Sequence, residues 1–253
     1  MRRAVLGAAA LALALPAAAR TNVPLRDDSA RSSLQTLADR GLAVYCGGGR
    51  GGYVALTFDD GPGRYTARVL AILRRARARA TFFVVGDRVR YWPGLVRAEV
   101  DQAAVGNHTW DHARLPGFGG RATYAEIART QSAVVAATGV RPLLFRPPYG
   151  ATSDSARRIA RALGLNVVLW SVDSGDSLPR ATADSVVRTV IPRLRPGAIV
   201  LLHDIHPAGV AALPRILRAL HRRGLRAVTV PELVALDPPA HAQLFAVRSS
   251  GRC

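Results

Sequence analysis

Residues 54–62 read Val-Ala-Leu-Thr-Phe-Asp-Asp-Gly-Pro, an apolar, strand-like run that stops at two carboxylates. Four more apolar runs also end in polar residues of the kinds that catalyse reactions. They are Gln102–Gly106 before His108, Leu143–Phe145 before Arg146, Asn166–Trp170 before Asp173, and Ala198–Leu202 before His203. Parallel strands of an α/β barrel bring their carboxyl ends to one face, so residues distant in the chain converge there. The pattern therefore predicts an active site at one mouth of a barrel.

Helix-length periodic segments separate the strand-like runs, which is typical of parallel strands joined by right-handed crossovers. We expect an α/β fold in which about seven parallel strands form a distorted (β/α) barrel. The expected strands cover residues 54–58, 80–85, 102–106, 143–145, 166–170, 198–202 and 226–230.

The ends of the chain differ from its middle. The 253 residues, 49% of them hydrophobic, suffice for one large domain. Residues 1–19 combine a basic start, an apolar stretch and small residues, which is typical of a secretory signal peptide. We expect a lead-in with a glycine-rich flexible linker at 20–52, the barrel domain at 53–236 and an irregular tail at 237–253. We also expect a secreted or wall-associated protein with no stable membrane span after signal cleavage, although an uncleaved anchor stays open.

The formal charge is +18, carried by arginine without any lysine. A basic surface favours anionic partners, such as an acidic cell wall or a nucleic acid. Nucleic-acid binding would call for a recognition motif or aromatic residues within the basic stretches, but only 6% of residues are aromatic. We therefore expect an acidic cell wall as the anionic partner and no binding of nucleic acid.

Two cysteines, Cys46 and Cys253, are present. In an oxidising compartment they could form a disulfide, or both could remain unpaired. The sequence leaves both alternatives open.

His108 and His112 are four residues apart, a spacing that on a helical turn puts both rings on one face, as in many zinc sites. The residue after His108 is Thr109 rather than glutamate, so the metalloprotease helix motif is absent and a base must come from elsewhere. Two unrelated surface histidines are the alternative.

Asp59 and Asp60 strengthen the metal hypothesis, although an ordinary acidic turn is the alternative. Neighbouring side chains of a strand point to opposite sides, so one carboxylate could bind a metal while the other faces a bound water. Asp60, His108 and His112 would leave a coordination position open, which is typical of a catalytic metal. Such a metal lowers the pKa of its water to about 7.

Five motifs then occur in order: Thr57–Pro62, His108–His112, Arg146–Tyr149, Asp173–Asp176 and Leu201–His203. Together they resemble the polysaccharide deacetylases of the NodB-homology type, carbohydrate esterase family 4. The resemblance covers residues 52–236. It implies a distorted (β/α) barrel and metal-dependent removal of acetyl groups from sugars.

The resemblance also implies roles for the metal-site residues. Asp59 would be the general base, and Asp60, His108 and His112 would hold a divalent metal, with zinc as the expected ion. His203 would be the general acid that protonates the leaving amine.

Supporting roles follow from the same resemblance. Arg146 would orient Asp59, the backbone N–H of Tyr149 would bind the oxyanion, and Leu201 would line the pocket for the acetyl methyl group. Asp176 would tune His203, and Arg79 would steady Asp176.

One departure concerns the substrate groove. Ser177 stands where the family commonly has a tryptophan after the second aspartate. We therefore expect Trp170 or Trp110 to supply that wall, with Tyr149 and Leu201 as the other substrate-binding residues.

The resulting hypothesis is an exported, metal-dependent N-deacetylase of polymers that contain N-acetylglucosamine, of the peptidoglycan or chitin type. An acetylxylan esterase with the same site is one alternative. A non-catalytic cell-wall-binding domain is another, but it would be expected to lack at least one of Asp59, Asp60, His108, His112 and His203, and all five are present.

Overall fold

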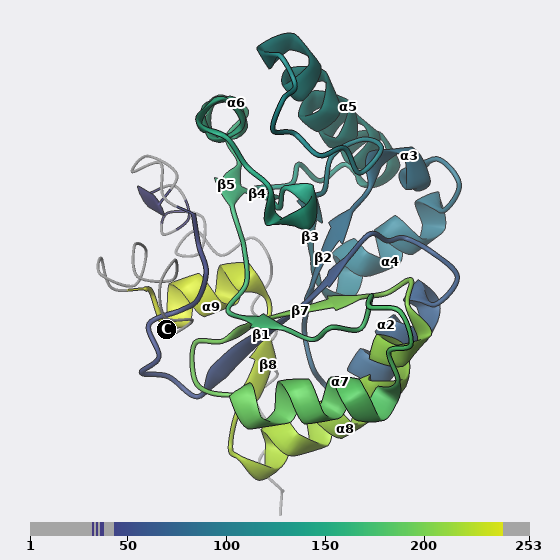
Figure 1. The fold of residues 1–253 in the computed structure, drawn as a ribbon, viewed down its shortest axis with the longest axis vertical. Helices are drawn as coiled ribbons and strands as arrows, with labels where there is room; N and C mark the ends of the chain where they lie inside the picture. The colour runs from purple at the N-terminus through teal and green to yellow at the C-terminus, as the bar shows by residue number, and fades with distance from the viewer. Residues whose placement is uncertain (1–31, 33, 35, 38–42, 240–253) are drawn as a thin grey trace, which may run out of the picture.

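The computed structural model describes residues 32, 34, 36, 37 and 43–239 (Figure 1). The expected signal peptide at 1–19, the segment after residue 239 and Cys253 lie outside these residues. Cys46 is buried, whereas its possible partner Cys253 lies outside the described residues. None of the helices in the described part of the chain has the length and apolar character needed to span a bilayer.

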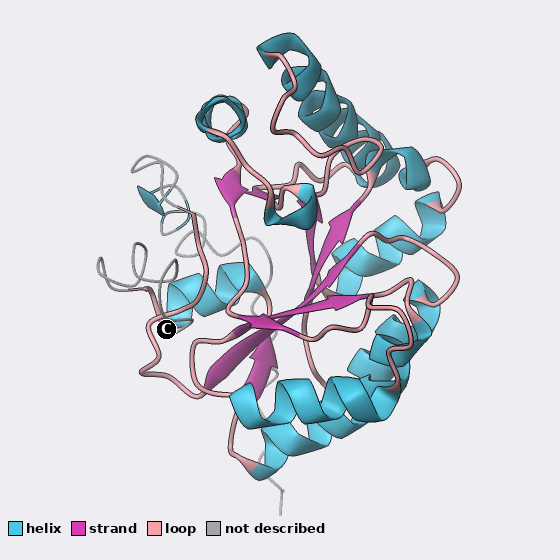
Figure 2. Cartoon of the chain, viewed as in Figure 1, coloured by secondary structure: helices cyan, strands magenta, loops and turns pink. Residues whose placement is uncertain are grey.

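One curled, parallel sheet forms the centre of the molecule (Figures 1 and 2). Within the described residues its strands are β1 Tyr53–Asp59, β2 Thr81–Val84, β3 Ala104–Asn107, β4 Leu144–Phe145, β5 Asn166–Val167, β6 Val172–Asp173, β7 Ile199–His203 and β8 Arg226–Val228. Their order is β5-β4-β3-β2-β1-β7-β6, with β8 pairing onto β1. The predicted distorted barrel of parallel strands is confirmed.

The strand expected at 166–170 is split in the structure. β5 ends at Val167, and the chain then bends, so that Ser171 donates to the Ile199 carbonyl and β6 pairs with β7. The lead-in covers this bend, because Val44 bridges to Val168 and Cys46 bridges to Ala198. The sheet therefore curls around without a continuous strand ladder at that side.

Helices alternate with the strands and cover the outer face of the sheet, except the last helix, which packs against the residues of the other face (Figure 2). They are α2 Thr66–Arg75, α3 Gly86–Val89, α4 Pro93–Gln102, α5 Gly120–Thr138, α6 Asp154–Ala162, α7 Ala183–Val190, α8 Pro207–Arg222 and α9 Val230–Leu236, with short 3-10 turns at Pro148–Gly150 and Ile191–Arg193. Local residues mark several ends: the Ser153 and Thr182 side chains accept N–H groups at the starts of α6 and α7, and Gly139 ends α5 with φ 72°.

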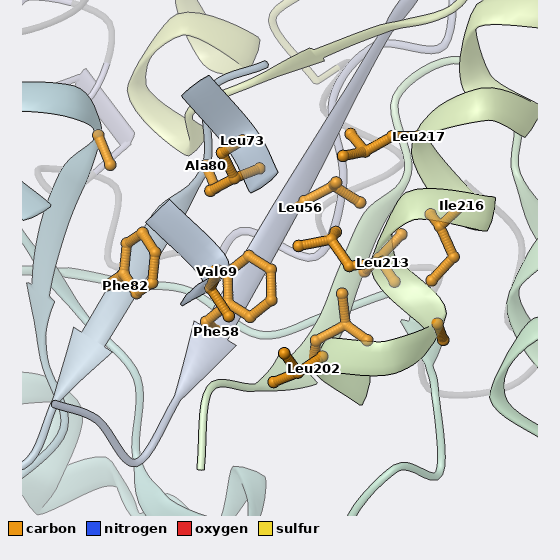
Figure 3. Packing of buried hydrophobic residues seen from close by; sticks show 14 of the residues in the cluster. Leu56, Phe58, Val69, Leu73, Ala80, Phe82, Leu202, Leu213, Ile216 and Leu217 are labelled. Atoms are coloured by element: carbon orange, nitrogen blue, oxygen red, sulfur yellow. The ribbon is translucent and has the colours of Figure 1, made fainter. Parts of the chain in front are cut away.

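Strand alternation determines which side chains reach the interior. In β1, Leu56 and Phe58 face outward into the apolar layer beneath the helices, where Leu213 and Ile216 of α8 also lie (Figure 3). Thr57 and Asp59, which alternate with these residues along the strand, are buried on the other face. Since Asp59 is in register with His203 of β7, both polar groups lie at the carboxyl ends of adjacent strands.

The glycine run at 47–52, expected to be a flexible linker, is held against the barrel. Asp237, a buried residue after α9, accepts hydrogen bonds from the backbone N–H groups of Arg50 and Gly51, each at 3.0 Å. Gly48 donates to the Asp237 carbonyl at 2.7 Å. The start of the tail thus fixes the lead-in beside β1.

The outward apolar layer predicts a clear stability effect. Leu56→Ala removes a side chain with 0% exposure and should lower the free energy of unfolding by about 2–5 kcal/mol, because it leaves a cavity. Leu236→Ala, at a side chain with 50% exposure, should cost about 0.5 kcal/mol or less. Urea denaturation measures both, and equal losses would contradict this assignment of the core.

Candidate active site and metal centre

A carboxylate and two imidazoles meet at the carboxyl ends of β1 and β3. Asp60 Oδ1 lies 3.3 Å from His108 Nε2 and 3.0 Å from His112 Nε2. The three potential ligand atoms all lie within 4.8 Å of one another. Burial raises the pKa of Asp60, but the contacts with His108 and His112 outweigh it and hold that pKa well below its ordinary value.

This donor set fits a metal ion. Ligand atoms that bind zinc at about 2.0–2.2 Å in tetrahedral geometry lie about 3.4 Å apart. The distances from Asp60 Oδ1 to the two imidazole nitrogens, 3.3 and 3.0 Å, are close to this value. His108 is also preset for metal binding, because its Nδ1 lies 2.6 Å from the Arg146 carbonyl oxygen. A carbonyl can only accept, so Nδ1 carries the proton and Nε2 keeps its lone pair for a metal.

The route by which the ligands converge differs from the prediction. Residues 108–112 form an irregular loop, so the expected helical turn is wrong. The rings approach to a centroid distance of 5.1 Å because Thr109 and His112 both adopt φ 65°. Asp60 likewise turns out of the strand at φ 72°, so Asp59 and Asp60 both lie near His108 instead of pointing to opposite sides.

Asp59 is fixed by a fully buried arginine. Arg146 Nη1 donates to Asp59 Oδ1 and to Thr57 Oγ1, each at 2.7 Å. The other guanidinium nitrogens donate to the backbone carbonyls of Val168 and Leu169, and the group lies 4.1 Å from the centre of the Phe83 ring. Burial lowers the pKa of Arg146 and Asp59 raises it. The guanidinium still remains charged, because its pKa starts so high.

His203 is held by Asp176. Its Nδ1 lies 2.7 Å from Asp176 Oδ1, and its backbone N–H donates to Oδ2 at 2.8 Å. The free side of the ring faces the metal centre, with Nε2 4.0 Å from Asp60 Oδ2. Burial lowers the pKa of His203, but the hydrogen bond and charge of Asp176, aided by Asp59 and Asp60, raise it to about 9.

The residues predicted to contact substrate lie around this centre. Tyr149 is 64% exposed, has φ 60° and places its ring edge-on to His112, with 4.7 Å between ring centres. Leu201 is buried two residues before His203 on β7. Trp170 is partly exposed and packs against Gly150, within 5.6 Å of the Arg146 guanidinium. A substrate role for each remains a prediction.

The expectation that Arg79 steadies Asp176 is wrong. Arg79 precedes β2, at the amino ends of the parallel strands, and its Nε lies 3.3 Å from Glu232 Oε1 of α9. Asp176 follows β6 at the carboxyl ends. The two residues therefore lie at opposite ends of the barrel.

Two supporting residues escaped the motif-based reasoning. Asp204, next to His203, turns away from it into the interior, where it contacts Thr66 and leaves no room for a side chain at Gly61. Gly209 of α8 has no room for a Cβ atom beside Asp176. Because side chains alternate along a strand, the sequence could have indicated that Asp204 and His203 point to opposite sides. No local sequence pattern indicates that position 209 must be glycine.

A barrel whose strand ends carry a carboxylate–dihistidine cluster and a histidine–aspartate pair is the arrangement of a hydrolase site. The chain matches the family model for polysaccharide deacetylase over residues 47–168. It is 37% identical to a chitooligosaccharide deacetylase of Rhizobium leguminosarum bv. trifolii, over 78% of this chain and 89% of that protein. The chain belongs to the polysaccharide deacetylase family.

Two further similarities agree with this membership. The chain is 42% identical to the peptidoglycan-N-acetylglucosamine deacetylase PgdA of Listeria monocytogenes. The match covers 71% of this chain but only 38% of that longer protein. The solved family 4 carbohydrate esterase from Streptomyces lividans superposes with a TM-score of 0.68 at 41% identity. That alignment covers 71% of this chain and 94% of the esterase.

The Asp176–His203 contact predicts a measurable shift. Asp176→Asn removes the carboxylate that raises the pKa of His203, so this pKa should fall well below about 9 and the imidazole should lose its proton at lower pH. NMR titration of the His203 ring measures the change. Asp173→Asn, at an exposed carboxylate three residues earlier, should leave the pKa of His203 unchanged. An unchanged pKa of His203 in Asp176→Asn would refute the role of Asp176 in raising it.

Proposed function

We propose that the chain is an exported, metal-dependent N-deacetylase that releases acetate from N-acetylglucosamine polymers of the peptidoglycan or chitin type. One observation carries the proposal: Asp59, Asp60, His108, His112 and His203 come from three separate strand ends and meet around one point. Each chemical task of acetamide hydrolysis then has a candidate group there.

The first task is to activate water. Asp60, His108 and His112 would hold a divalent cation, and two imidazoles with one carboxylate suit zinc. The bound cation would lower the pKa of a water and polarise the acetyl carbonyl. Asp59 lies 3.7 Å from His108 Nε2, at the edge of this cluster. Its Oδ1 is engaged by Arg146, so Oδ2 is the oxygen that accepts the proton of the attacking water.

The second task is to stabilise the developing oxyanion and seat the acetyl group. The backbone N–H of Tyr149, positioned by its left-handed conformation, donates to the oxyanion. Leu201 contacts the acetyl methyl group, and Trp170 supports the Gly150 turn beside Tyr149.

The third task is to protonate a poor leaving group. His203 keeps its proton near neutrality because Asp176 binds Nδ1, and Nε2 donates to the departing amine. This feature favours an amide substrate over an ester, since an alcohol leaves more readily than an amine. An acetylxylan esterase activity is the second candidate, supported by the likeness to a family 4 carbohydrate esterase.

Residues 1–19 and the charge of the chain support an extracellular, anionic substrate. The relatives named as peptidoglycan and chitooligosaccharide deacetylases favour N-acetylglucosamine polymers. Peptidoglycan is the substrate that fits both observations.

The proposal predicts chelator-sensitive acetate release. The full chain should release acetate from peptidoglycan and chitooligosaccharides, and a chelator should abolish the release until zinc is restored. Asp59→Asn should lower kcat by about 10²–10⁴-fold, because the general base is lost. Asp184→Asn, at an exposed carboxylate on α7, is the matched control and should stay active. Turnover that survives chelation, or an active Asp59→Asn variant, would refute the mechanism.

The role of His203 predicts a dependence on the leaving group. His203→Ala should slow cleavage of an acetamide by about 10²–10⁴-fold, but should affect an activated aryl acetate far less, since that leaving group scarcely needs a proton. Paired kinetics on the two substrates test this. Equal losses on both would exclude His203 as the proton donor.

A further inference from the structure

Glu126, a buried carboxylate of α5, contacts the loop that carries His108 and His112. Its Oε2 accepts the backbone N–H of Trp110 at 2.9 Å and that of Asp111 at 3.2 Å. Both amides lie between the two histidines in the chain. We propose that Glu126 is a positioning residue that holds this loop in its metal-binding shape and thereby sets the affinity of the metal site.

The loop needs such support because its conformation is intrinsically unfavourable. Thr109 and His112 both adopt φ 65°, in the left-handed region that residues with a Cβ atom rarely occupy. Two left-handed residues within the five-residue loop 108–112 persist only where neighbouring groups fix the backbone. The amides that Glu126 binds lie between these two residues, so its hydrogen bonds act where the backbone is most strained.

The opposite side of the loop is also fixed. The N–H groups of Gly86 and Asp87 in α3 donate to the carbonyls of Thr109 and Trp110 at 2.9 and 2.8 Å. Gly86 permits this approach, since a Cβ atom there would lie 2.7 Å from the Trp110 ring. The loop is thus held between α3 and α5.

The two histidines depend on Glu126 to different degrees. His108 has its own anchor, because Nδ1 contacts the Arg146 carbonyl. For His112 the described contacts are Asp60 and the rings of Tyr149 and His108, all part of the site itself. Its position therefore follows from the backbone just before it, where Glu126 binds the Asp111 amide. Loss of Glu126 should release His112 more than His108.

The experiment measures zinc affinity of the full chain by competition with a chromophoric chelator. Glu126→Ala should weaken zinc binding by about 10–100-fold, the usual effect of losing a group that orients metal ligands. Glu126→Gln keeps an acceptor oxygen at the same reach and should recover part of the affinity. Should the alanine variant not fold, Glu126→Asp, which is too short to reach both amides, should show the same weakening.

Glu232→Ala is the matched control. Glu232 is also 8% exposed and accepts a backbone N–H, that of Thr229 at the start of α9, away from the metal site. Its loss should lower the melting temperature but leave zinc affinity unchanged. Wild-type affinity in Glu126→Ala, or an equal loss in Glu232→Ala, would overturn the proposal.

This inference rests on the proposed metal site, and its failure can be told apart from failure of that site. If wild-type protein binds no zinc, or His112→Ala binds it normally, the metal centre itself is wrong. If wild type binds zinc and His112→Ala does not, only the affinity of the Glu126 variants decides the positioning role.

Discussion

The buried guanidinium of Arg146 is the interaction on which the site depends. It joins Asp59 and Thr57 of β1 to the backbone at Val168 and Leu169. The backbone carbonyl of Arg146 contacts the His108 ring. A buried charge of this kind is tolerated only when it is paired and fully hydrogen-bonded, and its removal would leave Asp59 buried without a counter-charge. One residue therefore links the proposed base Asp59, the candidate metal ligand His108 and the bend that divides β5 from β6.

Two carboxylates at the same mouth of the barrel have different partners. Asp59 Oδ1 accepts a hydrogen bond from Arg146, and Asp59 Oδ2 lies on the side of His108. Asp176 is held against an imidazole, and their contact raises the pKa of His203 to about 9. In the proposed reaction these partners position Asp59 to act as the base and His203 to act as the acid. The partners, rather than the reacting groups alone, separate the two roles.

Several residues of the candidate site leave regular structure where the site is built. Asp60, Thr109, His112 and Tyr149 all have positive φ, although none is glycine. Such strain persists only where neighbouring groups determine the backbone, and the Glu126 and Gly86 contacts do so around the histidine loop. Strand alternation brings Asp59 and His203 inward, whereas left-handed turns bring in Asp60 and His112.

The sequence by itself determined the parallel barrel and the order of polar residues at its strand ends, because alternation, helix periodicity and turn residues are local patterns. It also indicated Asp60, His108 and His112 as one cluster, since residues at the carboxyl ends of parallel strands must converge. Only the tertiary structure decided that Arg79 pairs with Glu232, that 108–112 is a loop and that Glu126 holds it. These contacts join elements from different parts of the fold, and their geometry depends on how helices pack and loops turn, which no short pattern encodes.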